Sequence, residues 1–233
     1  PWAARLAPLA NLRSRVPAFA ALAERWLGLS AKRPWPRWSA DRFSTPPAPV
    51  GSGSKGEVAL FVDTFSTWFE PENARAAVAV LAAAGYRVHV PVTPGRPGCC
   101  GRTFLSAGMV EEARTEARRL LRTLSPFAER GIPIVGIEPS CVYTLRDEWQ
   151  GMLPKAETAV LREPVLGFAE FLARAASGGK LDLKLQARWA KALVHGHCHE
   201  KAFGAFGDVQ KSLGLVPGLN VASIESSCCG MAG

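Results

Sequence analysis

The chain lacks any apolar run of the roughly 18 to 20 residues that a membrane-spanning helix needs. It also lacks a dinucleotide-binding fingerprint, because its one glycine-rich stretch, residues 51–56, precedes an expected strand instead of following one. No signal-peptide pattern follows Pro1, and no nucleic-acid-binding motif occurs. These absences argue against a membrane-spanning, nucleotide-binding, secreted or nucleic-acid-binding protein. No residue is nominated as catalytic.

Acidic residues are scarce near the amino terminus, where most of the net charge of +8 is concentrated. Residues 1–50 hold eight Lys or Arg against Glu24 and Asp41, so the remaining chain contributes only +2. Four tryptophans lie in the same segment: Trp2, Trp26, Trp35 and Trp38. We expect a solvated connector here, with contact to an anionic membrane surface or a partner domain as the alternative.

The cysteines of the chain are clustered. Four of the six form two adjacent pairs, each followed by glycine: Cys99-Cys100-Gly101 and Cys228-Cys229-Gly230. Adjacent cysteines bridge poorly, and clustering is unlike the disulfide framework of a secreted protein. Thiolates beside a glycine suit a soft metal or an iron–sulfur cluster, because glycine allows close backbone approach. Buried structural thiols are the alternative, but two copies of the pattern favour metal binding.

The apolar pattern predicts parallel α/β structure. Residues 1–28 indicate two helices interrupted at Pro17, and residues 34–54 form a linker rich in proline. Val58–Val62 is a near-continuous apolar run, typical of a strand buried on both faces of a parallel sheet. Residues 86–90 and 132–137 are further strands, and Cys141 follows the last of them, where open α/β sheets place ligands.

The order of strand, ligand turn, helix, strand and Cys-Cys-Gly occurs twice. The second copy begins at residues 192–194 and reaches Cys198, whereas the first has Thr64 in the equivalent turn. The fold class is therefore α/β, with two tandem Rossmann-like parallel-sheet units as a pseudo-repeat. We expect four segments: a helical and proline-rich linker (1–55), a first unit (56–150), a helical connector without a chemical motif (151–191) and a second unit (192–233). The second unit ends before its closing strand, so we expect a piece of a longer protein.

Three histidines alternate around Cys198. On an extended segment His195, His197 and His199 would point to one side and Cys198 to the other. A mixed Cys/His zinc site is one interpretation, and hydrogen bonding of the histidines to cluster sulfurs is another. A third is a nucleophilic Cys198 activated by a neighbouring histidine. His89 is expected to be an ordinary, partly buried residue.

Several short motifs resemble the cysteine-rich (CCG) region of iron–sulfur oxidoreductases: Phe61-Val-Asp-Thr-Phe65, Phe69-Glu-Pro71, Cys99-Cys-Gly-Arg102, Glu138-Pro-Ser-Cys141, His195-Gly-His-Cys-His199 and Ser227-Cys-Cys-Gly-Met-Ala-Gly233. The resemblance covers residues 56–233. These motifs are most similar to those in the carboxyl-terminal part of FAD-linked oxidases and of fusion proteins of the D-lactate or glycolate dehydrogenase type.

The resemblance implies an iron–sulfur electron-transfer region of a flavin-dependent 2-hydroxy acid dehydrogenase, which passes electrons from FAD towards a quinone or another carrier. The implied metal ligands are Cys99, Cys100, Cys141, Cys198, Cys228 and Cys229. The implied cofactor-binding residues are Gly101, Gly230, His197, His199 and Thr64. Thr64 departs from the family pattern, since many members have cysteine there.

The resemblance also implies the surroundings of this region. The cluster is of the 4Fe–4S type, in some members of a non-cubane form, and FAD lies outside the chain. Flavin and ferredoxin-like domains of the same polypeptide or complex are the implied partners. The enzyme would act on CH–OH donors, although this part alone would oxidise no substrate. A reducing cytoplasm is the expected location, with peripheral attachment to the inner membrane left open. A structural zinc module that docks other subunits is the alternative function.

Overall fold

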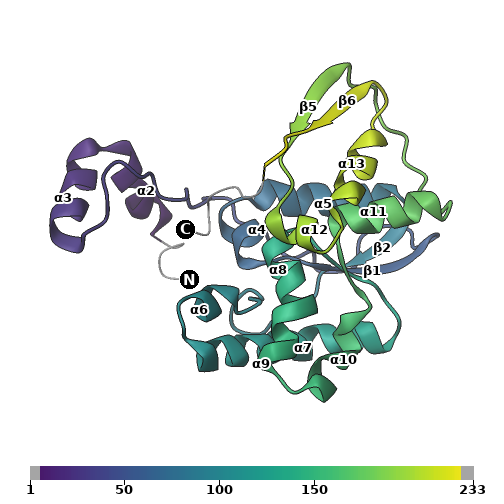
Figure 1. Ribbon diagram of the computed structural model, residues 1–233, viewed down its shortest axis with the longest axis horizontal. Helices are drawn as coiled ribbons and strands as arrows, with labels where there is room; N and C mark the ends of the chain where they lie inside the picture. Colours follow the sequence, from purple (N-terminus) through teal and green to yellow (C-terminus); the bar gives the residue numbers. More distant parts are fainter. Residues whose placement is uncertain (1–5, 227–233) are drawn as a thin grey trace.

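A four-stranded parallel sheet organises the body of the protein, whose computed structural model describes residues 6–226 (Figure 1). The strand order is β2-β1-β3-β4. Its strands are β1 (Gly56–Phe61), β2 (Tyr86–His89), β3 (Ile134–Gly136) and β4 (Val165–Gly167). The sheet confirms the prediction of an α/β fold with parallel strands.

Helices cover both faces of this sheet (Figure 1). On one side lie α5 (Pro71–Ala83) and α11 (Phe168–Ser177), and on the other lie α7 (Val110–Glu129), α9 (Trp149–Met152) and α10 (Lys155–Arg162). Shorter elements complete the set: α4 (Thr64–Trp68), α6 (Arg102–Ser106), α8 (Pro139–Tyr143) and the π-helical turn η1 (Thr144–Glu148).

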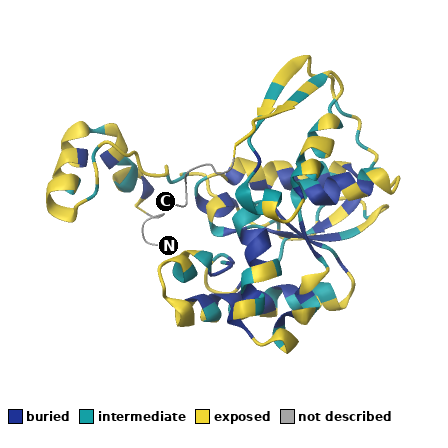
Figure 2. Ribbon diagram, viewed as in Figure 1, coloured by how far each residue is buried: buried dark blue, intermediate teal, exposed yellow. Residues whose placement is uncertain are grey.

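Strand β1 is buried on both faces, which explains its continuous apolar run. Val58 and Leu60 pack into one core cluster, whereas Ala59 and Phe61 pack into the other. None of these four side chains is more than 4% exposed. In Figure 2 the strands accordingly form the dark centre of the body.

Strand β4 lies inside the stretch that we expected to be a helical connector. It has only three residues, paired in parallel with β3 from Ile134 opposite Val165 to Gly136 opposite Gly167. Such a short strand shows no period that distinguishes it from the start of an amphipathic helix, and α11 follows it directly. The first sheet therefore continues past residue 150, while the division of the chain into units stays a prediction.

A second parallel pair lies beyond this sheet. Strand β5 (Ala190–Val194) pairs with β6 (Leu219–Ser223), and α12 (Cys198–Ala202) and α13 (Phe206–Gly214) connect them. The chain turns between the two helices at Gly204, which adopts a φ of 67°. Helix α13 packs against α11. The described residues give this sheet two strands, so the tandem repeat stays a prediction.

The amino-terminal segment forms a helical hairpin that projects from the body (Figure 1). Helix α2 (Ala7–Arg15) and helix α3 (Pro17–Leu27) meet at the extended residue Val16. The expected interruption at Pro17 is confirmed, since Pro17 opens the second helix, where its missing N–H costs no hydrogen bond.

The linker after the hairpin has no regular structure but is attached to the body. The amide of Ser39 donates to the carbonyl of Trp68 at 2.8 Å. Val50 exchanges two backbone hydrogen bonds with Val88, at 3.0 and 2.7 Å, and so extends the sheet beside β2. Within residues 6–226, no helix is both long and apolar enough to cross a bilayer.

Trp149 provides a test of the core on the α7 side. Its ring is fully buried, and its Nε1 donates to the carbonyl oxygen of Cys100 at 2.8 Å. Replacing it with Phe leaves that carbonyl without a partner, so we expect Trp149→Phe to lower the free energy of unfolding by about 1–3 kcal/mol. Urea denaturation measures this. The control, Trp189→Phe, changes a ring that is 87% exposed, and an equal loss there would contradict the assignment.

Candidate metal centre

The Cys-Cys-Gly turn stands at the start of α6, after the loop that leaves β2. Gly101 is the residue before the helix and has a φ of 89°, in the left-handed region that favours glycine. A Cβ at this position would lie 2.7 Å from the carbonyl oxygen of Ala113 in α7. Glycine is therefore required here both for the turn and for the close packing of α7.

Thr64 and Cys141 follow neighbouring parallel strands. Thr64 is the first residue of α4, directly after β1, and the carboxylate of Asp63 caps this helix by accepting from the amides of Phe65 and Ser66 at 2.7 and 3.1 Å. Cys141 lies in α8, which begins just after β3. Because β1 and β3 are adjacent, their carboxyl ends bring both residues to the same edge of the sheet.

Three thiols converge at this edge. The Sγ atoms of Cys100 and Cys141 are 3.2 Å apart, and the amide of Gly101 donates to the Sγ of Cys99 at 3.5 Å. Thr64 and the three cysteines line one cavity of about 370 Å³. The hydroxyl of Thr64 donates to the carbonyl of Gly98 at 3.4 Å. The structure thus brings together Thr64, Cys99, Cys100 and Cys141, as the sequence predicted.

Without a bound cation these thiols are neutral. Hydrogen bonding to Cys100 and burial raise the pKa of Cys99, and hydrogen bonding to Cys141 together with burial raises that of Cys100. The hydrogen bond from Cys100 lowers the pKa of Cys141, but burial and nearby carboxylates outweigh it and raise this pKa as well. A metal-bound thiol loses its proton, so a cation would reverse this balance.

The donor set fits a soft metal group. The site has two buried sulfurs, a third that is partly buried and accepts from a backbone amide, and a glycine that keeps the backbone close. Thiolate-held clusters use these features. In the described part of the chain, no three His, Cys, Asp or Glu side chains converge tightly enough to hold a single metal ion.

Aromatic side chains that the sequence analysis did not nominate form the outer wall of the cavity. They are Trp38, Phe65, Trp68, Phe69 and Phe104, joined by Arg96 and Glu116. Trp38 comes from the linker and lies 4.5 Å from the Phe69 ring, centroid to centroid. The three aromatic residues of the α4 segment could have been found from their helical spacing next to Thr64. No local signal connects Trp38 with the cysteines.

The second motif is not an extended segment, so the expected alternation of its histidines is wrong. His197 caps α12, and its Nδ1 accepts from the amide of His199 at 3.3 Å. The rings of His197 and His199 are 5.4 Å apart, whereas His195 contacts Ser226 instead. Cys198 begins α12, at the carboxyl end of β5. Its expected partners, Cys228 and Cys229 with Gly230, lie outside the described residues.

Helix α8 touches both motifs. It carries Cys141 towards the cavity, while its Ser140 Oγ lies 3.2 Å from the Nε2 of His197. Its Tyr143 stacks on Phe203 of the second unit, with ring centroids 4.8 Å apart. Burial lowers the pKa of both His197 and His199, so the imidazoles next to α8 are neutral near pH 7.

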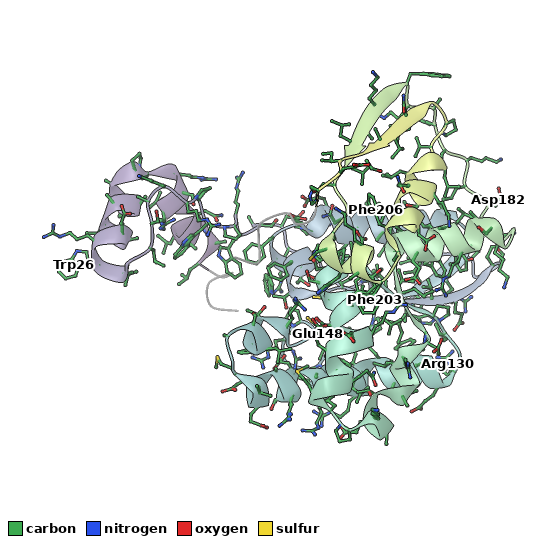
Figure 3. The ribbon with its side chains drawn as sticks, viewed as in Figure 1. Trp26, Arg130, Glu148, Asp182, Phe203 and Phe206 are labelled. Carbon is green, nitrogen blue, oxygen red and sulfur yellow. The ribbon has the colours of Figure 1, made fainter. Side chains whose placement is uncertain are left out.

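A salt bridge lies beside this helix contact. Arg102 follows the Cys-Cys-Gly turn and pairs with Glu148, whose carboxylate is also 3.9 Å from the Nε2 of His199 (Figure 3 labels Glu148 and Phe203). The two cysteine motifs are therefore connected by side chains of α6, α8 and the π-helical turn. Outside the site, His89 is partly buried beside Glu57 at 3.3 Å, as expected.

One known protein family matches part of this chain. Residues 62–146 match the family of the cysteine-rich domain named CCG. This segment runs from the carboxyl end of β1 through the Cys-Cys-Gly turn to the helix that carries Cys141. This match confirms the resemblance to the cysteine-rich (CCG) region that the sequence motifs indicated.

Individual relatives extend the comparison. The chain is 26% identical over 231 residues to the C subunit of anaerobic glycerol-3-phosphate dehydrogenase from Escherichia coli K12, covering 97% of this chain and 57% of that protein. The chain therefore spans little more than half the length of this relative. It is 28% identical to lactate utilization protein A 1 of Bacillus mycoides, covering 76% and 71%. It is 26% identical to D-2-hydroxyglutarate dehydrogenase of Pantoea ananatis, covering 76% of this chain and 16% of that protein. No solved structure matches.

Asp63 provides a pH-dependent test of the helix that carries Thr64. Burial raises the pKa of this carboxyl above its usual 3.8, despite the hydrogen bonds from Ser66. A raised pKa in the folded state means that the stability contribution is full at low pH and falls as pH rises. Asn keeps the cap without the buried charge, so we expect the stability of Asp63→Asn relative to the parent to increase between about pH 4 and pH 7.

Urea denaturation at the two pH values measures the difference. Asp63→Ala is the matched control. It also lacks the charge, so its stability should change with pH as that of Asp63→Asn does, but it should be lower than Asp63→Asn by about 1 kcal/mol at both pH values because the cap is lost. A relative stability of Asp63→Asn that falls with rising pH would contradict the assignment.

Proposed function

We propose that this chain is an iron–sulfur electron-transfer region of an FAD-dependent oxidoreductase. The observation that supports it is the convergence of three thiols at the carboxyl edge of a parallel sheet: the buried Cys100 and Cys141 and the partly buried Cys99. Electrons would pass from FAD, held outside this chain, towards a quinone or another carrier.

The names of the relatives support a CH–OH donor. Glycerol 3-phosphate, lactate and D-2-hydroxyglutarate, after which they are named, each carry a hydroxyl group on the carbon that a dehydrogenase would oxidise. The proposed parent enzyme acts on a 2-hydroxy acid or a similar alcohol. In this proposal the region oxidises no substrate itself and serves the transfer of electrons after the flavin step.

The residues of the chain have separate roles in this proposal. When bound, a 4Fe–4S cluster, cubane or non-cubane, supplies one-electron redox chemistry. The three cysteines hold it as thiolates, and the Gly101 amide hydrogen-bonds to a ligand sulfur. Trp149 fixes the Cys100 carbonyl, so the turn keeps its shape. Trp38, Trp68 and Phe69 limit water at the outer wall, which strengthens electrostatic interactions inside.

We further propose that the chain is a tandem pair of such units, with boundaries at 1–55, 56–150, 151–191 and 192–233. Cys198, Cys228 and Cys229 would be the ligands of the second unit, with Gly230, His197 and His199 beside them. The contact of Ser140 with His197 favours two units that act together. Flavin and ferredoxin-like domains are the proposed partners. The proposed location is the cytoplasm, peripheral to the inner membrane.

Anaerobic reconstitution with iron and sulfide tests this function. We expect the parent protein to bind iron and to give an EPR signal on reduction. Cys141→Ser should lower the bound iron at least about tenfold if the first site holds its own cluster, because a hydroxyl is a poor ligand for iron in such sites. Cys198→Ser is the matched variant in the second motif. It leaves the first site intact if the units are separate and lowers both signals if they share a cluster.

Elemental analysis of protein purified without added metal distinguishes the alternative. Tightly bound zinc, a colourless protein and loss of the fold with chelator would identify a structural zinc module that docks other subunits. Rapid alkylation of Cys198 alone in metal-free protein would favour the nucleophile instead. A protein that takes up no iron would refute the proposal.

Thr64→Cys gives a second, independent test. This substitution adds a fourth thiol to a cavity that already contains three. We expect the variant to bind iron more tightly than the parent, by about tenfold or more, since a thiolate replaces a hydroxyl that ligates poorly. Competition with a chelator measures the affinity. Thr103→Cys, which also lines the cavity, is the control, and an equal gain there would show that position 64 is not special.

A further inference from the structure

The amino-terminal hairpin presents its apolar side chains to solvent. On α3, Phe19, Leu22 and Trp26 recur at three- and four-residue steps and so share one face. They are 48%, 52% and 74% exposed, and the adjacent Leu27 is 69% exposed. Figure 3 shows Trp26 at the outer end of the hairpin, directed away from the body.

The hairpin is closed on its other side, so the exposed face is not the result of loose packing. Arg13 is only 8% exposed, and its guanidinium donates to the carbonyls of Leu29, Ser30 and Arg33 at 3.1, 2.7 and 3.2 Å. It also stacks over Trp35 at 4.7 Å. These contacts fold the chain after α3 back onto α2, while the face of Trp26 stays uncovered.

A second clamp fixes the hairpin to the linker. The side chain of Asn11 accepts from the amide of Trp38 at 2.9 Å and donates to its carbonyl at 2.8 Å. Trp38 in turn packs on Phe69 in the wall of the metal cavity. The hairpin that carries the apolar face of α3 is therefore held together by side-chain hydrogen bonds and is attached to the body near the candidate metal centre.

The segment that carries this face is also basic. Exposed cations occur throughout the hairpin and the turn after it: Arg15, Arg25, Lys32, Arg33 and Arg37. Glu24 is the only acidic residue among residues 1–40. A helix with Trp, Phe and Leu on one face and with Lys and Arg around it is typical of segments that lie in the headgroup region of a bilayer.

We propose that the α2–α3 hairpin binds the surface of a membrane that contains anionic lipid. Trp26, Leu22 and Phe19 enter the boundary between headgroups and acyl chains, and the surrounding cations contact lipid phosphates. The charge of the segment argues for this occupant, because an apolar face that served only protein packing would not need an excess of cations around it. The inference rests on the hairpin alone and holds whether or not the thiols bind a cluster.

Sedimentation with vesicles tests the proposal on the full chain. One set contains phosphatidylcholine alone, and the other contains about one third phosphatidylglycerol. We expect binding to the anionic vesicles to be at least about tenfold stronger, and to weaken as salt is raised, because part of the attraction is electrostatic. A blue shift of tryptophan fluorescence should accompany binding.

Two variants separate the apolar and charged contributions. Trp26→Ala should weaken binding to anionic vesicles about tenfold, and Arg25→Glu should weaken it by a similar factor, since it reverses a charge at the surface. Trp189→Ala is the matched control, because this tryptophan is also highly exposed but lies beside β5. It should change binding less than about twofold.

Three results would overturn the proposal. They are no binding to either set of vesicles, equal binding to neutral and anionic vesicles, and equal losses for Trp26→Ala and Trp189→Ala. The first would indicate that a protein surface covers the face instead. Circular dichroism confirms that each variant is folded, and iron content is measured separately, so failure here leaves the proposed function untouched.

Discussion

The parallel pairing of β1 with β3 is the constraint on which the candidate site depends. It places Phe61 opposite Gly136, so the turns that follow both strands begin side by side. Gly136 has no side chain, and a Cβ there would lie 2.5 Å from the Cγ2 of Val142. Because this space is open, α8 folds closely over the strand end and brings Cys141 to Cys100.

Burial gives these thiols their chemistry. Hydrogen bonding and burial raise the pKa of Cys99 and Cys100, and burial with nearby carboxylates raises that of Cys141 against the hydrogen bond from Cys100. Three neutral thiols packed together gain little stability from one another, whereas a cationic group would convert them into thiolate ligands. The packing of α7 against Gly101 and the hydrogen bond from Trp149 hold the turn in the required shape.

Two further contacts connect the cysteine cavity with other parts of the protein. Through Ser140 and Tyr143, α8 contacts the second motif. A displacement of that motif would therefore change the contacts of the helix that carries Cys141. Through Trp38, the outer wall of the cavity is attached to the amino-terminal hairpin. These two attachments extend from one cavity towards two separate surfaces.

The sequence by itself determined the local chemistry: the Cys-Cys-Gly turn, the glycine at 101, the buried run of β1 and the proximity of Thr64 to the cysteines. These follow from near neighbours in the chain and from the rule that parallel strands end at one edge. Tertiary structure alone decided the short strand β4, the placement of His197 and His199 at the start of α12, the entry of Trp38 into the cavity and the outward face of α3. Each of these features depends on contacts between residues that are far apart in the chain. Short strands, caps and linkers take their conformation from the packing around them, so no local periodicity in the sequence predicts them.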